Sequence, residues 1–229
     1  MNRRTALLAG LATLVAGPVL SQGSNQGGSG PVNPNPGGGR LWFDPTQLPS
    51  FTGVVDRYLL TPEGKTDRLM FREGPQVLFP EHIADDIMKA VPPGQSIVVY
   101  GIRARRAPAI TLLAWARDGG SQPQFVDRPS WTFPEYRAAD EMLQVSGTVR
   151  APLYTPQGDV IGAVLDEGVV IRVPAGVAQA LGDRLAVGRS IAAAGHGATV
   201  QSRGKALDAE RIGESADKLG PLPPAERPQ

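Results

Sequence analysis

The sequence has no cysteine and only two histidines. The missing cysteines exclude disulfides, thiolate nucleophiles, cysteine-ligated zinc or iron–sulfur sites and a lipoprotein anchor. His82 and His196 leave little for a histidine-based metal site or catalytic triad. The chain also lacks an excess of either charge, with 23 Lys and Arg against 22 Asp and Glu. Composition therefore gives no electrostatic indication of a nucleic-acid partner or an anionic membrane.

The first 21 residues have the pattern of an export signal. Arg3 and Arg4 precede an apolar run over residues 6–19, and small residues at Val19 and Ser21 predict cleavage before Gln22. The run is shorter than a bilayer-spanning helix, so we expect no transmembrane segment after cleavage. The pattern predicts a periplasmic or secreted protein. Both the general secretory and the twin-arginine routes fit it.

Two segments are too polar to bury a core. Residues 22–40 are rich in Gly, Pro and Asn, and residues 213–229 are rich in Pro and charge. Neither can bury enough apolar surface to offset its ordering entropy, so we expect a disordered linker and a disordered tail. Residues 119–144 form a further linker that contains an aromatic segment.

The main feature of the sequence is an internal repeat. Residues 53–101 align without a gap to residues 147–195 at an offset of 94, and 14 of these 49 positions are identical. The Thr-Pro-x-Gly of residues 61–64 returns at residues 155–158, where Pro and Gly suit a tight hairpin turn. The repeat predicts two copies of one module, over residues 41–118 and 145–212.

Each copy gives the same order of elements. Alternation of apolar and polar residues predicts strands over residues 52–60, 67–72 and 76–79, and over 146–154, 161–166 and 170–173. A helical apolar stripe follows in both copies, at Ile83, Ile87 and Val91 and at Val177, Leu181 and Leu185. Further strands are expected over residues 96–103 and 110–116, and over 190–196 and 205–212.

Five strands with a helix between the third and the fourth resemble the OB-fold, a small Greek-key barrel. The passage from strand three through the helix to Gly94-x-Ser96-Ile97 and Gly188-x-Ser190-Ile191 carries this resemblance. We therefore expect an all-β fold with short helices, made of two tandem five-stranded OB-like barrels, similar to small bacterial secreted or periplasmic OB-fold proteins. A small SH3-like barrel is the alternative, which the position of the helix disfavours.

We find no residue pattern for catalysis, metal binding or a cofactor. The sequence has no Ser-His-Asp arrangement, His-Glu-x-x-His motif or P-loop. His82 and His196 occupy non-equivalent places in the two copies, and adjacent Asp85 and Asp86 do not share a helix face. We therefore expect these four residues to be surface groups, and we expect a non-enzymatic protein that binds no metal and no cofactor.

The resemblance to OB-folds implies a ligand surface on the outer face of strands two and three and on the loops beside them. In the first copy we expect that surface to contain eight residues, Arg68, Met70, Arg72, Gln76, Leu78, Arg103, Arg105 and Arg106. Cations beside an apolar platform suit a phosphate backbone or an acidic glycan. The matching face of the second copy is more apolar, and it could instead pack against another surface.

Two functions remain open from the sequence. The first is an exported, non-catalytic binding module for an oligosaccharide, a peptide or protein, or another polymer. The second is a structural or adaptor protein of the cell envelope, with an envelope protein as partner. Nucleic-acid binding is a less favoured hypothesis, because export and a near-neutral net charge both disfavour it.

Overall fold

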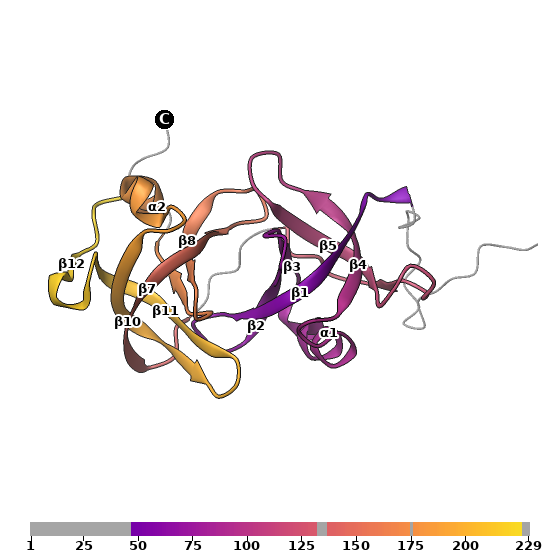
Figure 1. Cartoon of the computed structure of the whole chain (residues 1–229), viewed down its shortest axis with the longest axis horizontal. Coiled ribbons are helices and arrows are strands. Elements are labelled where there is room, and N and C mark those ends of the chain that lie inside the picture. Colours follow the sequence, from indigo (N-terminus) through magenta and orange to yellow (C-terminus); the bar gives the residue numbers. More distant parts are fainter. Residues whose placement is uncertain (1–46, 132–136, 175, 226–229) are drawn as a thin grey trace, which may run out of the picture. The chain divides into compact units, whose positions relative to one another are not determined.

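The chain forms two five-stranded β-barrels in tandem. The computed structural model describes residues 47–131, 137–174 and 176–225, so the predicted leader and the linker over residues 22–40 lie outside the described residues. Figure 1 shows the strands of each copy wound around a centre of their own. The strands of the first barrel are β1 (Ser50–Leu60), β2 (Thr66–Phe71), β3 (Gln76–Leu78), β4 (Ser96–Arg103) and β5 (Ala109–Ala116). Those of the second are β7 (Glu141–Tyr154), β8 (Val160–Leu165), β9 (Val170–Arg172), β10 (Ser190–Val200) and β11 (Gly204–Gly213).

The strand order in both barrels is that of the OB-fold. The first barrel has the order β3-β2-β1-β4-β5, and the parallel pairing of β3 with β5 closes it. In the second barrel, β7 lies between β8 and β10, and the parallel pairing of β9 with β11 closes the ring. All other neighbours in the two rings are antiparallel. The predicted fold class is confirmed, with two OB-like barrels and little helix.

A short helix lies between the third and fourth strands of each barrel, as predicted. In the first barrel a 3-10 turn (Glu81–Ile83) leads into α1 (Ala84–Ala90), and in the second α2 (Val177–Leu181) continues into a 3-10 turn (Gly182–Leu185). The buried hydroxyl of Tyr58 donates a hydrogen bond of 2.6 Å to the carbonyl of Val91 just after α1. None of the helices that the structure describes has the length and hydrophobicity needed to span a bilayer.

Each barrel encloses its own hydrophobic core. The residues expected to point inward from strands two and three do so, and they are Leu69, Phe71, Val77 and Phe79 in the first barrel and Ala163, Leu165, Ile171 and Val173 in the second. Both predicted helical stripes pack against these cores. The period-two alternation therefore assigned the inner faces of strands two and three correctly in both barrels.

The hairpin turns expected from the repeat are present in both copies. The amide of Gly64 donates to the carbonyl of Thr61, and the amide of Gly158 donates to that of Thr155. Gly64 has φ +86° and Gly158 has φ +97°, a backbone conformation that side chains with a Cβ rarely adopt. Both turns therefore strongly favour glycine at this place.

The predicted disorder of residues 213–229 is wrong for the part that the structure describes. A 3-10 turn (Ala216–Lys218) leads into β12 (Gly220–Pro221), which pairs with β11, and Leu222 packs against the second core. The pairing supplies backbone hydrogen bonds that composition does not reveal. Residues 226–229 lie outside the described residues.

The predicted linker over residues 119–144 is also partly structured. β6 (Gln124–Phe125) pairs with β5, and Val126 is buried in the first core. β7 begins at Glu141, five residues before the expected strand. Of the aromatic segment, residues 132–136 lie outside the described residues, and Trp131 is 48% exposed.

Candidate functional site

Four of the five residues that we expected on the outer face of β2 and β3 are buried. They point away from the core of their own barrel, yet Arg68, Met70, Gln76 and Leu78 are at most 2% exposed. The expectation that solvent reaches them is wrong, because the second barrel covers this face. Arg72, just beyond the end of β2, is exposed. A ligand can therefore reach the other four only if the barrels separate.

An apolar cluster joins the two barrels. Leu59 and Leu60 at the end of β1 pack against residues of the second barrel, namely Leu153, Val164, Val170 and Ala206. A smaller cluster combines Leu78, Ala107 and Ala109 with Tyr154. Burial of such side chains contributes roughly 1.5–3 kcal/mol each. The contact between the barrels therefore has its own hydrophobic core.

A buried charge network crosses the same contact. The carboxylate of Asp67 accepts hydrogen bonds from Arg68 at 3.0 and 3.1 Å and from Arg172 of the second barrel at 2.8 Å. The guanidinium of Arg68 also donates to the carbonyl of Tyr154 at 2.7 Å. Charges taken out of water need such partners, since an uncompensated buried charge is strongly destabilising. Arg68 thus binds the second barrel, and its charge is neutralised within the protein.

Equivalent positions of the repeat meet each other across this contact. Asp56 pairs with Arg150 at 3.0 Å, and these two residues are related by the 94-residue offset. The turn glycine Gly64 lies against Ala198, and its counterpart Gly158 lies against Ala104, which is the counterpart of Ala198. Such reciprocity is the mark of an isologous, two-fold contact. The two barrels therefore pack through the same face, related by a pseudo-two-fold axis.

This shared face is the surface through which OB-folds usually bind ligands. That surface consists of strands two and three with the loops that join strands one to two and four to five. Here both strand pairs, both β1–β2-type turns and parts of both β4–β5-type loops contribute to the contact between barrels. The suggestion that the second copy packs against another surface is confirmed, and that surface is the first copy.

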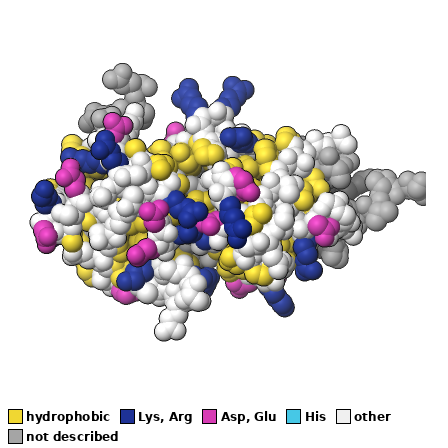
Figure 2. All heavy atoms as spheres, in the orientation of Figure 1, with side chains coloured by type: hydrophobic (Ala, Val, Ile, Leu, Met, Phe, Trp, Pro, Cys, Tyr) yellow, Lys and Arg dark blue, Asp and Glu magenta, His cyan; other side chains and the backbone are white. Residues whose placement is uncertain are grey.

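The basic loop between β4 and β5 remains on the surface. Arg103, Arg105 and Arg106 are exposed, as predicted, and line a hollow of about 410 Å³. Figure 2 shows Lys and Arg side chains standing out at the top of the view, over the place of this loop in Figure 1. Within the described residues, none of the three forms an ion pair within 4.0 Å. Buried Ala107 and the turn at Gly158 hold the base of the loop.

The two histidines lie at the surface, and each is hydrogen-bonded to a different carboxyl group. His82 is 2.7 Å from Asp127, and this hydrogen bond lowers the pKa of the Asp127 carboxyl. His196 is 2.5 Å from Glu210. In the part of the chain that the structure describes, no three His, Asp or Glu side chains gather closely enough to hold a metal ion.

Sequence reasoning missed the contact between the barrels, although the repeat carried two signs of it. Opposite charges stand at equivalent positions at Asp56 and Arg150. Adjacent Leu59 and Leu60 cannot both face one barrel core in a regular strand, and in the structure a register shift between them goes with the burial of both in the cluster between the barrels. Reading these features across the repeat would have indicated a second apolar face on β1.

No protein family model matches the chain, and no curated protein is significantly similar to it. We therefore argue function from the fold and from the surface that remains exposed.

Proposed function

We propose that the chain is an exported, non-catalytic binding protein that contacts an anionic polymer through the basic β4–β5 loop of its first barrel. The observation that carries this proposal is the exposure of Arg103, Arg105 and Arg106 within one four-residue stretch. The 94-residue offset aligns this stretch with residues 197–200 of the second copy, which contain no cation and lie within β10. The hairpin between β10 and β11, residues 201–203, carries one cation, Arg203, so the cluster of three arginines is particular to the first barrel.

The anchoring of this loop supports a binding role. Ala104 and Ala107 approach the turn glycine Gly158 of the second barrel, where a Cβ would meet them at 3.2 and 3.1 Å. A loop held at its base loses less conformational entropy when its side chains bind a partner. Guanidinium groups also match the geometry of carboxylate, sulfate and phosphate groups.

Export and the lack of catalysis are parts of the same proposal. Export is supported by the charged, apolar and small-residue pattern of residues 1–21. A non-catalytic role is supported by a sequence without a recognisable nucleophile, base or cofactor motif. Determination of the N-terminal residue of the native protein tests export, with Gln22 expected and an intact Met1 contradicting it.

A structural or adaptor protein of the cell envelope is the second candidate. The contact between the barrels favours it, because the surface that OB-folds use for ligands is occupied within the chain. Two barrels joined in this way would hold partners at a fixed spacing. Nucleic-acid binding remains a weaker third candidate for the reasons of charge and export given above.

The test compares two variants with the same change of charge. In one, Arg103, Arg105 and Arg106 are replaced by serine. In the control, Arg117, Arg128 and Arg137 are replaced by serine, and these three are also exposed. Both proteins and the parent are titrated with heparin and with a single-stranded oligonucleotide at two salt concentrations.

We expect the loop variant to lose affinity for heparin and to show a smaller salt dependence of binding, while the control variant keeps most of its affinity and of its salt dependence. Each exposed arginine contributes about 1 kcal/mol or less, so the three must be removed together. Binding to single strands through Z phosphates gives a log–log salt slope of about −0.7Z, which identifies a nucleic-acid mode. No binding of either polyanion by the parent, or equal binding by both variants, would favour the adaptor role.

A further inference from the structure

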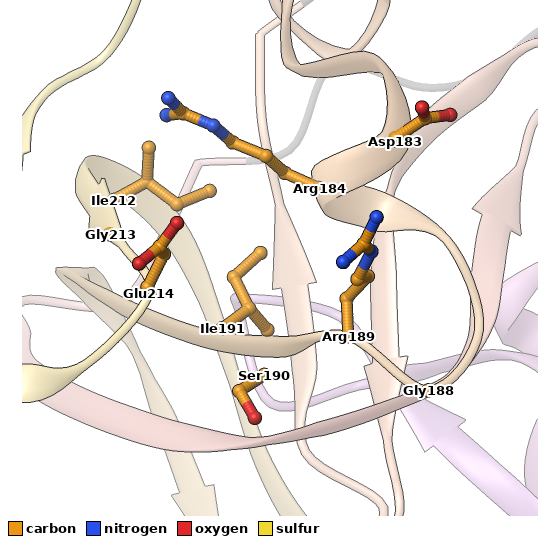
Figure 3. A pocket seen from close by; sticks show the side chains of 9 residues that line it. All are labelled: Asp183, Arg184, Gly188, Arg189, Ser190, Ile191, Ile212, Gly213 and Glu214. Atoms are coloured by element: carbon orange, nitrogen blue, oxygen red, sulfur yellow. The ribbon is translucent and has the colours of Figure 1, made fainter.

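The second barrel has a hollow at one end. The cavity measures about 530 Å³, within the usual range of small-molecule sites. Figure 3 shows Ile191 and Ile212 beside one another in this hollow, with Arg184, Arg189 and Glu214 around them. Ile191 and Ile212 are 1% and 4% exposed, so each borders the hollow with a small part of its side chain, and the walls of the hollow are charged.

The repeat explains why the hollow exists in this barrel. The strand register places three core residues of the first barrel in one cross-strand row, Phe51, Val99 and Trp115. The same register in the second barrel gives Val145, Ala193 and Ile212. Every residue of the second row is smaller than its counterpart. Trp115 is 3% exposed and part of the first core. In the first barrel an indole therefore fills the position that Ile212, beside the cavity, occupies in the second barrel.

The cations of the hollow are also particular to the second copy. Arg184 and Arg189 stand where the 94-residue offset places Ala90 and Gln95 in the first copy. Among the described residues, neither arginine has a carboxylate within 4.0 Å. Figure 3 shows the Arg184 side chain reaching toward Ile212 and the Arg189 side chain rising from the segment just before β10. Loss of core volume and gain of two cations thus coincide at one place.

We propose that this hollow binds a small organic anion, with its carboxylate or phosphate group between Arg184 and Arg189 and its apolar body on Ile191 and Ile212. Guanidinium groups form paired hydrogen bonds with both kinds of anion. Glu214, across the hollow in Figure 3, is an acceptor for a hydroxyl or amine donor of the ligand. This site is separate from the basic loop of the first barrel and stands independently of the function proposed above.

The experiment uses the full chain and three small probes of similar size. Benzoate and phenyl phosphate carry the two anionic groups, and benzamide is the neutral control. Binding is followed through the backbone amide signals of Gly188, Ser190 and Gly213, which line the hollow. The test variant is the double substitution Arg184→Gln and Arg189→Gln at two exposed positions. The control variant is Arg117→Gln and Arg128→Gln in the first barrel and the segment after it.

We expect saturable shifts of these three amides with at least one anion, and the stronger anion identifies the class of ligand. The double variant at Arg184 and Arg189 should weaken binding by about tenfold or more, which corresponds to about 1.4 kcal/mol. The control variant should bind like the parent, and benzamide should not bind. Absence of saturable shifts with both anions, equal binding of benzamide, or unchanged binding by the double variant would overturn the proposal.

A second substitution tests the hollow by its volume. Ile212→Trp restores the residue of the first barrel at this register position, and we expect it to abolish binding while the far-ultraviolet circular dichroism stays that of the parent. A folded Ile212→Trp variant that binds the anion as the parent does would contradict the placement of the ligand's body. If this variant does not fold, the arginine substitutions decide the proposal alone.

Discussion

Arg150 Nη2 lies 3.0 Å from Oδ2 of Asp56, and these two residues occupy the same position in the two copies of the repeat. A residue that contacts its own counterpart lies close to the two-fold axis of an isologous contact. In a symmetric pair of identical barrels this position would bring two like charges together. Because the two copies carry Asp and Arg at this position, the two charges attract each other. The contact is therefore more favourable between the two different barrels of this chain than between two identical barrels.

Exchange of the two charges tests this relationship. Arg150→Asp and Asp56→Arg should each destabilise the protein by about 1 kcal/mol, because each places like charges at the axis. The double variant should recover a substantial part of the combined loss, which urea denaturation of all four proteins measures as a coupling free energy. Strictly additive effects would mean that the two side chains do not interact in solution.

Removal of Asp67 should be far more costly than removal of a surface carboxylate. Asp67→Ala leaves the guanidinium groups of Arg68 and Arg172 buried without the carboxylate that bridges them, so we expect a loss of about 3–5 kcal/mol in the free energy of unfolding. The control Asp86→Ala, at an exposed helix position, should change it by about 0.5 kcal/mol or less. Similar losses for both variants would contradict the buried network.

A pair of glycine substitutions tests the contact between hairpin turns. Gly158 and Gly74 both have positive φ, and asparagine tolerates that conformation better than most residues. A side chain at Gly158 meets Ala104 and Ala107, whereas one at Gly74 has no atom within 4 Å of its Cβ. Gly158→Asn should therefore destabilise the protein by about 1–3 kcal/mol more than Gly74→Asn. Equal melting temperatures for the two variants would argue against close packing of this turn on the first barrel.

The sequence predicted each barrel well because each barrel repeats simple local patterns. Alternation along β2 and β8 identified the inward residues, and the Pro and Gly of the repeat identified the turns. The predicted ligand face failed at Arg68 and Gln76 for a physical reason. Polar side chains on the outer face of a strand normally indicate that this face is exposed to solvent. Here the side chains are buried, and carbonyl and carboxylate groups of neighbouring segments accept their hydrogen bonds in place of water.

The hollow of the second barrel could not be predicted from local sequence patterns. A gapless offset of 94 does not align Trp115 with Ile212, because the hairpin between β10 and β11 is longer than its counterpart. Strand register places the two residues in equivalent positions, and register follows from tertiary pairing rather than from the local pattern. The basic loop, in contrast, was visible in sequence as three arginines within four residues.

Solvent access to the outer face of β2 shows most directly whether the two barrels pack through this face. The chain has no cysteine, so a single introduced thiol reports one position without interference. Met70 is 1% exposed beneath the second barrel, and Met142 is 60% exposed on β7. We expect Met70→Cys to react with a maleimide about 100-fold more slowly than Met142→Cys in native buffer, and equally fast in denaturant. Equal rates in native buffer would show that the face is open to solvent and that the two barrels do not pack through it.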